Sequence, residues 1–227
     1  MLKKLLLLLL FIFYNSTIFS QKANEIGIFG GVSYYTGDVN QDKLFKSVSP
    51  AFSFLYKYEI NKRYNIRLNL SFSNLTGSDS NADNLYQQTR NHSFSTAITE
   101  FAFLFEFNFF PYKSESQFDY FSPYVVSGIG VFISPTVTDL PANPVIPIGI
   151  GFKYAFTKKL SLSVEWMYRK TFTDKIDQLL PNEYEGTANF QSKQTSYNGS
   201  KDWYSFAGIS LTYKFAFVNN SCPAYGH

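Results

Sequence analysis

The segment from Ala97 to Phe109 alternates between two chemically different kinds of side chain. Phe occupies every odd position from 101 to 109, whereas the even positions include Glu100, Glu106 and Asn108. Successive side chains of a β-strand point to opposite faces, so this segment would have one aromatic face and one face with two carboxylates and an amide. Alone, such a strand would also suit a soluble sandwich, in which the apolar face is buried and the polar face is solvated.

The same alternation recurs along the chain, and eight strands are predicted in all. They cover residues 25–35, 51–60, 64–72, 97–109, 124–133, 148–156, 160–169 and 203–217. Tight turns at 61–63 and 157–159 join two pairs of strands as hairpins. In the segment 124–133, which contains Gly128 and Gly130, the sequence does not show which face is which.

The connections between these strands differ in length in a regular way. Long loops are predicted at 37–49, 74–93, 135–147 and 170–202, and a medium connection at 111–122. Strands of about ten residues, apolar and polar faces, and alternating short and long connections are typical of small transmembrane barrels. An open sheet edge in lipid would leave backbone groups unpaired, so such a sheet must close. We therefore predict an all-β fold, an eight-stranded antiparallel transmembrane β-barrel of the outer-membrane type.

The N-terminal residues have the form of a secretory signal peptide. Lys3 and Lys4 precede an apolar run at 5–14, and cleavage is predicted after Ser20. A transmembrane anchor is the alternative, but this run is shorter than the roughly 20 residues that span a bilayer. The predicted organisation is a signal peptide at 1–20, a barrel at 21–217 and a periplasmic C-terminal tail at 218–227. The aromatic content of 19% suits strands and membrane interfaces, so we predict an outer-membrane protein; a secreted β-domain is the alternative.

Composition and motifs argue against several classes of function. The formal net charge is +3, which becomes +1 once Lys3 and Lys4 are removed, and this is too little for nucleic-acid binding. Cys222 is the only cysteine, so no internal disulfide is possible. The sequence has no glycine-rich phosphate loop, metal-ligand spacing or nucleophile elbow. We therefore predict no catalytic residue, no cofactor and no metal.

One enzymatic alternative comes from small barrels that hydrolyse lipid acyl chains with Ser and His near the outer rim. His92, Ser93 and Ser95 lie near the outer end of the fourth predicted strand. A serine and a histidine on the same lipid-facing side of a strand must be two positions apart, because adjacent residues point to opposite faces. Position 94 is Phe, so the alternation favours a polar loop end over a catalytic pair.

The polar faces of the predicted strands carry five cations and four anions. These inward-facing residues are Lys57, Glu59, Arg67, Glu100, Glu106, Lys153, Glu165, Arg169 and Lys214. A buried charge is costly unless it is paired, so the near balance of charge predicts a lumen crossed by ion pairs. We expect a plugged barrel rather than an open channel; an ion path through the barrel is the alternative.

Several segments of the chain are familiar in detail. They are 25–31 (EIGIFGG), 35–39 (YTGDV), 146–154 (IPIGIGFKY), 165–174, which includes RKTFTD, and 202–210 (DWYSFAGIS). These segments resemble the PorG-like outer-membrane barrels of Bacteroidota, and the resemblance covers nearly the whole mature chain. It implies a component of the type IX protein secretion system, which also supports gliding motility. It implies association on the periplasmic side with a ring built from a lipoprotein and its partner, and it carries over no catalytic residue.

The predicted orientation determines which residues are available to a partner. With a periplasmic N-terminus, the short turns and the tail face the periplasm and the long loops face outward, in a barrel surrounded by outer-membrane lipid. The candidate periplasmic contacts are Tyr112, Lys113, Cys222, Pro223 and Tyr225. A frayed terminus is the alternative for the tail. A passive barrel with adhesive outer loops is the alternative function.

Overall fold

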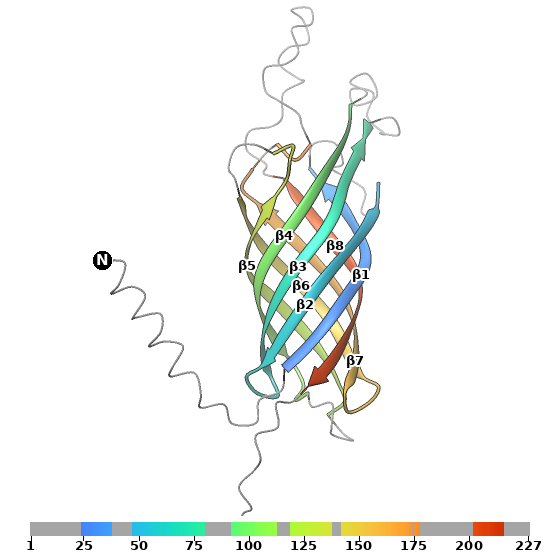
Figure 1. Ribbon diagram of the computed structural model, residues 1–227, viewed down its shortest axis with the longest axis vertical. Coiled ribbons are helices and arrows are strands. Elements are labelled where there is room, and N and C mark those ends of the chain that lie inside the picture. The colour runs from blue at the N-terminus through green and yellow to red at the C-terminus, as the bar shows by residue number, and fades with distance from the viewer. Residues whose placement is uncertain are drawn as a thin grey trace, which may run out of the picture.

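The computed structural model describes residues 24–37, 47–79, 92–112, 119–137, 142–173, 175–177 and 202–215. Within these residues, eight antiparallel strands follow one another around a single closed barrel (Figure 1). The strands are β1 (Asn24–Thr36), β2 (Ser49–Glu59), β3 (Tyr64–Ser78), β4 (Ser93–Asn108), β5 (Phe121–Ile133), β6 (Asn143–Ala155), β7 (Leu160–Thr171) and β8 (Trp203–Phe215). Because β1 pairs with both β2 and β8, the sheet has no free edge, and the predicted fold class is confirmed.

The two ends of the barrel differ in their connections. At one end, which we call the turn end, β1 begins, β8 ends and two tight turns join β2 to β3 and β6 to β7. The side chain of Asn61 accepts hydrogen bonds from the backbone N–H groups of Arg63 (2.8 Å) and Tyr64 (2.9 Å). The hydroxyl of Thr157 accepts from Leu160 N–H at 3.0 Å. These local hydrogen bonds stabilise each turn, and Asn and Thr side chains commonly make such bonds to nearby backbone groups in turns. The opposite end is the loop end.

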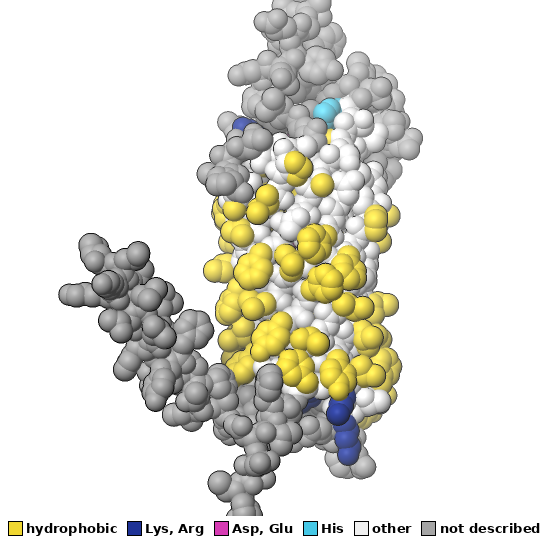
Figure 2. Space-filling view, viewed as in Figure 1, with side chains coloured by type: hydrophobic (Ala, Val, Ile, Leu, Met, Phe, Trp, Pro, Cys, Tyr) yellow, Lys and Arg dark blue, Asp and Glu magenta, His cyan; other side chains and the backbone are white. Residues whose placement is uncertain are grey.

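The outer wall of the barrel is hydrophobic. Phe101, Phe103 and Phe105 on β4 are 51%, 46% and 44% exposed, whereas Leu104 and Glu106 between them are fully buried. Figure 2 shows many hydrophobic side chains on the visible face of the wall, mostly in its middle and lower part. Such a large exposed apolar surface marks contact with lipid or another protein. None of the described residues forms a helix long and apolar enough to cross a membrane.

The structure resolves the two faces of β5. Ile129 is 68% exposed and Ile133 is 56% exposed, whereas Tyr124, Val126 and Phe132 are buried. The odd-numbered residues of this strand therefore face outward. The alternation was hidden in the sequence because two of the inward-facing positions, 128 and 130, are glycines, which carry no side chain to mark the face.

The prediction of a loop over residues 74–93 is wrong at both of its ends. β3 continues to Ser78 and β4 begins at Ser93, and the two strands stay in register to the Ser78–Ser93 pair. Asn74 and Ser95 are joined by a side-chain hydrogen bond of 3.0 Å on the outer surface. The outward residues here are polar, so the strands lose their apolar face near the loop end while the backbone ladder continues.

The predicted loop over 135–147 is also too long, because β6 begins at Asn143 and contains Pro144 and Pro147. Pro147 has no N–H to donate to a ladder. The β5–β6 register leaves out Pro147 and Ile146, between the Ser127–Ile148 and Gly130–Val145 pairs. The interruption therefore lets the proline occupy a strand that remains paired with β7 on its other side.

The remaining boundary differences are small, and some predicted segments cannot be compared. β5 begins at Phe121 instead of 124, and β8 is described to Phe215. The predicted signal peptide, the tail at 218–227, and the contact residues Lys113, Cys222, Pro223 and Tyr225 lie outside the described residues.

Candidate functional site

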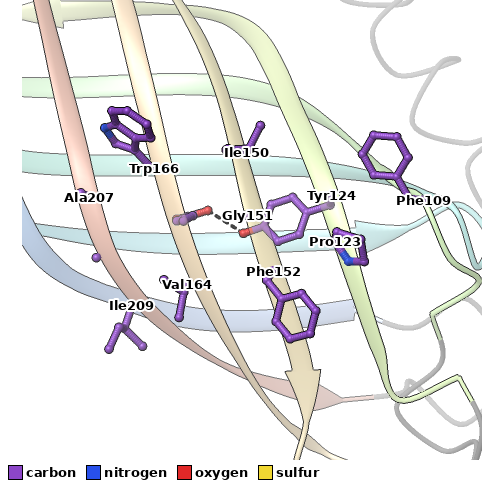
Figure 3. Close-up of a pocket in the computed structure, with 12 residues that line it drawn as sticks. Phe109, Pro123, Tyr124, Ile150, Gly151, Phe152, Val164, Trp166, Ala207 and Ile209 are labelled. Carbon is purple, nitrogen blue, oxygen red and sulfur yellow. Dashed lines mark hydrogen bonds between the residues drawn. The ribbon is translucent and has the colours of Figure 1, made fainter.

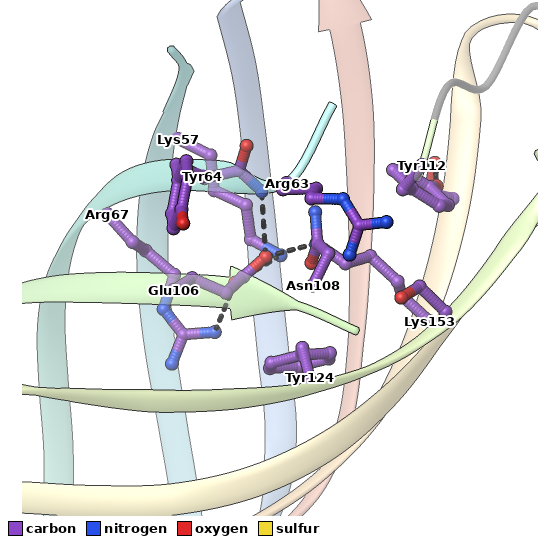
Figure 4. A network of polar contacts seen from close by, with 12 residues as sticks. Lys57, Arg63, Tyr64, Arg67, Glu106, Asn108, Tyr112, Tyr124 and Lys153 are labelled. Carbon is purple, nitrogen blue, oxygen red and sulfur yellow. Dashed lines mark hydrogen bonds and ion pairs between the residues drawn. The ribbon is translucent and has the colours of Figure 1, made fainter. Parts of the chain in front are cut away.

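The lumen near the turn end holds a group of five charged side chains around Glu106, which we call the Glu106 cluster (Figure 4). Glu106 of β4 pairs with Lys153 of β6, and its Oε2 lies 3.5 Å from Lys57 Nζ of β2. Arg67 of β3 places Nη1 3.8 Å from Glu106 Oε2 and 2.7 Å from Glu165 Oε2 of β7. These side chains are at most 3% exposed. Five strands thus meet at one buried carboxylate pair.

The register explains why Glu106 is central to this cluster. Lys57 and Arg67 lie directly opposite each other on β2 and β3, and two like charges in such a position repel. Asn65, two residues before Arg67 on the same face, is opposite Glu106 and donates a 2.9 Å hydrogen bond to its Oε1. Glu106 therefore lies beside both cations and offsets their repulsion.

Two tyrosines complete the Glu106 cluster. Tyr124 donates a 2.9 Å hydrogen bond to Glu165 Oε2, and Lys153 Nζ lies 4.9 Å from the Tyr124 ring centroid. Lys153 Nζ also lies 4.8 Å from the ring of Tyr112, whose hydroxyl bonds Ser161 Oγ at 2.6 Å. These distances suit cation–π attraction. The sequence prediction of the lumen did not include either tyrosine, although Tyr124 follows from the alternation of β5 once its faces are known.

Tyr112 closes the lumen at the turn end. Its side chain is only 4% exposed, and its backbone N–H donates to Lys62 O at 2.9 Å. Burial raises the pKa of the Tyr112 phenol, and the hydrogen bond to Ser161 opposes this rise only in part. Tyr112 was predicted as a partner contact, but most of its side chain faces the lumen.

A second group lies nearer the loop end, and we call it the Glu100 cluster. Arg169 of β7 donates from Nε to Glu100 Oε2 of β4 at 2.8 Å, and the Tyr204 hydroxyl of β8 donates to the same oxygen at 2.5 Å. The guanidinium carbon of Arg169 lies 3.8 Å from the ring centroid of Phe206. All four side chains are buried. The lumen is therefore filled at this level by an arginine held between a carboxylate and an aromatic ring.

A short segment that follows β7 covers the mouth of the barrel at the loop end. Ile176 is fully buried; its carbonyl accepts from Thr96 Oγ1 at 2.7 Å, and its N–H donates to Asp202 Oδ2 at 2.9 Å. The backbone oxygen of Asp177 lies 2.8 Å from His92 Nε2. We call this segment, residues 175–177, the mouth segment. Sequence patterning did not anticipate it, because it belongs to the connection predicted as an outer loop.

The structure places the remaining charged residues of the predicted set at the turn end. Lys214 of β8 pairs with Glu59 of β2 at 3.0 Å, and Glu59 is the more exposed of the two at 17%. Glu25 was missed by the prediction; it is 4% exposed and lies in register with Lys57 and Lys214. Its position on the same face as Gly27 and Phe29 is the sequence signal that could have placed it in the lumen.

The chain matches one known family over almost its whole length. A family model described as a domain of unknown function, DUF6089, matches residues 3–225. The chain belongs to the DUF6089 family. No curated protein matches this DUF6089 member in sequence.

Several solved structures are similar to this DUF6089 barrel at low sequence identity. Ail, the attachment invasion locus protein of Yersinia pestis, crystallised with the heparin analogue sucrose octasulfate, is 12% identical with a TM-score of 0.48, covering 86% of this chain and 100% of Ail. Neisserial surface protein A is 9% identical with a TM-score of 0.49, and OprG of Pseudomonas aeruginosa is 11% identical with a TM-score of 0.43. Each covers 86% of this chain and 98% of its own.

The rim residues of the DUF6089 barrel have structural partners. Ser95 is exposed on the outer wall and bonds Asn74, whereas the His92 ring contacts the mouth segment. Among the described residues, no group of three or more His, Cys, Asp or Glu side chains is placed to hold a metal ion. In the described residues, side chains pack the lumen, with Tyr112 buried at the turn end and Ile176 buried at the loop end.

Proposed function

We propose that this DUF6089 protein is a closed, non-enzymatic barrel of the outer membrane with a structural role. The observation that carries the proposal is the filling of the lumen from one end to the other. Tyr112 covers the turn end, the Glu106 and Glu100 clusters cross the interior, and Ile176 lies in the mouth. Eight strands leave an interior that side chains can fill. The exposed hydrophobic wall supports the placement in lipid.

A filled lumen should not conduct ions. In planar bilayers at neutral pH, the purified full-length protein is expected to give no steady current, because Arg67 and Arg169 are fully buried and engaged with carboxylates across the lumen. The double variant Arg169→Ala/Tyr204→Ala removes two large side chains of the Glu100 cluster and so widens the lumen. Its current is compared with that of the unaltered protein. A steady current from the unaltered protein would contradict the structural role and favour an ion path.

More specifically, we propose that the barrel is a component of the type IX secretion and gliding machinery. The resemblance of five segments to PorG-like barrels supports this assignment. In that role the turn end faces the periplasm and meets the ring of a lipoprotein and its partner. Exposed Lys62, Arg63, Lys158 and Lys159 lie on the two tight turns and give this end a basic surface. Figure 2 shows basic side chains at this end, beyond the hydrophobic wall.

Affinity purification of the tagged full-length protein from outer membranes in mild detergent tests the assignment. We expect periplasmic ring proteins to co-purify. Replacing residues 218–227 by a Gly/Ser segment of equal length should reduce their recovery if the tail is the contact. The matched control replaces residues 181–190 of the outer connection in the same way and should leave recovery unchanged. Recovery of a folded barrel without ring proteins would contradict the secretion role.

A passive barrel with adhesive outer loops is the second candidate. The observation that favours it is the length of the connection after β7, which extends from residue 172 to residue 202. Deletion of the gene would then change surface binding and leave secretion intact. A lipid-modifying activity is disfavoured, because Ser95 bonds an amide and His92 contacts a backbone oxygen.

A further inference from the structure

A groove of about 690 Å³ crosses the outer wall of the barrel. It begins at the turn end of β4 and β5 and runs across β6 and β7 to β8 (Figure 3). Its walls are apolar and include Phe109, Pro123, Ile150, Phe152, Trp166 and Ile209. Sites for single small molecules typically have volumes of about 300–1,000 Å³, so the groove has room for one such molecule.

Small residues create the groove. Ala207 of β8 carries a single methyl group where its register neighbours are Trp166 and Val32. Gly151 and Gly208 also line the groove, and at these two positions the floor of the groove consists of backbone alone. A Cβ on Gly151 would lie 2.4 Å from Cζ of Tyr124, so the ring beneath excludes a side chain there. The floor is therefore packed from below and does not collapse into the lumen.

The walls of the groove face the surroundings of the barrel. Ile150 is 57% exposed, Val164 is 53% exposed and Phe152 is 45% exposed. On a barrel in lipid, an exposed apolar groove is filled by the tails of membrane lipids or by the apolar surface of a partner. The dimensions favour a lipid tail: four strand spacings of about 4.8 Å give a length of roughly 19 Å. One leaflet of a bilayer core is about 15 Å thick, which one acyl chain spans.

A cation lies at the end of the groove where the head group would be. Arg63 of the β2–β3 turn is exposed and donates from Nη1 to Phe109 O at 2.8 Å. Phe109 lines the groove and bonds Pro123 through its N–H at 3.0 Å, so the guanidinium is attached to the turn-end wall. A guanidinium has five N–H donors, so one bond to Phe109 leaves others that suit phosphate oxygens.

We propose that the groove binds one phospholipid of the periplasmic leaflet, with an acyl chain between β5 and β8 and its phosphate at Arg63. The proposal rests on the placement of the barrel in the outer membrane and is independent of the secretion partner. A second copy of the chain is the competing occupant. A stable protein interface buries about 800 Å² per partner, which requires a broad surface instead of a groove one chain wide.

Native mass spectrometry of the full-length barrel titrated with phosphatidylglycerol tests the proposal. We expect one retained lipid in the unaltered protein. Ala207→Phe fills the groove and should lower retention about tenfold, which corresponds to 1.4 kcal/mol. The matched control is Ala97→Phe, because Ala97 also faces the outer wall but lies on β4 away from the groove. Val164→Trp is a second groove-filling variant, and a heat-dependent shift in electrophoretic mobility verifies that each barrel is folded.

The phosphate contact is tested separately. Arg63→Gln should weaken the binding of phosphatidylglycerol about tenfold. It should leave the binding of a diacylglycerol with the same acyl chains unchanged, because this lipid has no phosphate. Lys170→Gln, at an exposed cation of the loop end, should change neither. Equal retention by folded Ala207→Phe, Val164→Trp and Ala97→Phe barrels would overturn the proposal. Dimers that replace the lipid-bound monomer would assign the groove to a second copy. Neither result would affect the recovery of ring proteins, so the two proposals fail independently.

Discussion

The substitution Glu106→Gln is expected to destabilise the barrel by about 3–5 kcal/mol, the usual cost of breaking a buried ion pair by removing one partner. Glu106 contacts three cations, Lys57, Arg67 and Lys153, and is fully buried. Glutamine keeps the shape of the side chain but loses its charge, so the cluster retains three cations and a single carboxylate. Urea unfolding in lipid vesicles, followed by the fluorescence of Trp166 and Trp203, measures the loss.

Two further variants separate the effect of charge from the effect of packing. Glu106→Gln/Lys153→Met removes one cation together with the carboxylate and should recover part of the lost stability, because fewer buried charges remain unpaired. Glu59→Gln breaks the pair with Lys214 at the turn end and should cost less than Glu106→Gln, because Glu59 is 17% exposed and pairs with a single cation. If Glu106→Gln and Glu59→Gln had equal effects, burial would not determine the strength of these pairs.

Much of the fold was predictable because the two environments of each strand differ so strongly. Lipid and lumen select opposite chemistry, so alternation along β4 identified the inward Glu106 and the outward Phe105 from sequence alone. The prediction was wrong where this contrast disappears. Polar outward residues near Asn74 resemble a loop, and Pro147 resembles a strand breaker, although the ladder on its other side is intact.

The sequence predicted which charged residues face the lumen better than it predicted which of them pair with one another. Arg67 and Glu165 are 98 positions apart, on strands β3 and β7 that are not neighbours in the sheet. Their contact depends on the stagger of all the strands between them, which the alternation does not contain. The mouth segment was also unpredictable, because Ile176 lies in the connection after β7, and its burial depends on backbone bonds to Thr96 and Asp202 and on a hydrophobic cluster from distant strands.

The seam between β1 and β8 closes the barrel, and Gly31 lies at its centre opposite Gly208. A Cβ on Gly31 would be 2.2 Å from Ala207 O and 2.7 Å from Gly208 Cα. Both are backbone atoms, so no side-chain rotation can make room. The inward space beside this pair is taken by Phe29 and Phe206, whose ring centroids are 6.5 Å apart. The glycines therefore let two strands and two rings pack together at the seam.

Gly31→Ala should consequently cost about 3 kcal/mol or more, at the upper end of the range for overpacking, because the strands must separate where the sheet closes. The neighbouring Gly30→Ala is the matched control: its Cβ would meet nothing within 4 Å, since Gly30 faces the outside of the barrel. An alanine there should be neutral or stabilise the strand by up to about 1 kcal/mol. The folded fraction after refolding into vesicles, read from the heat-dependent mobility shift, compares the two variants. Equal folding of both would mean that the seam tolerates an inward methyl group, and that β1 and β8 do not need their close approach for the barrel to close.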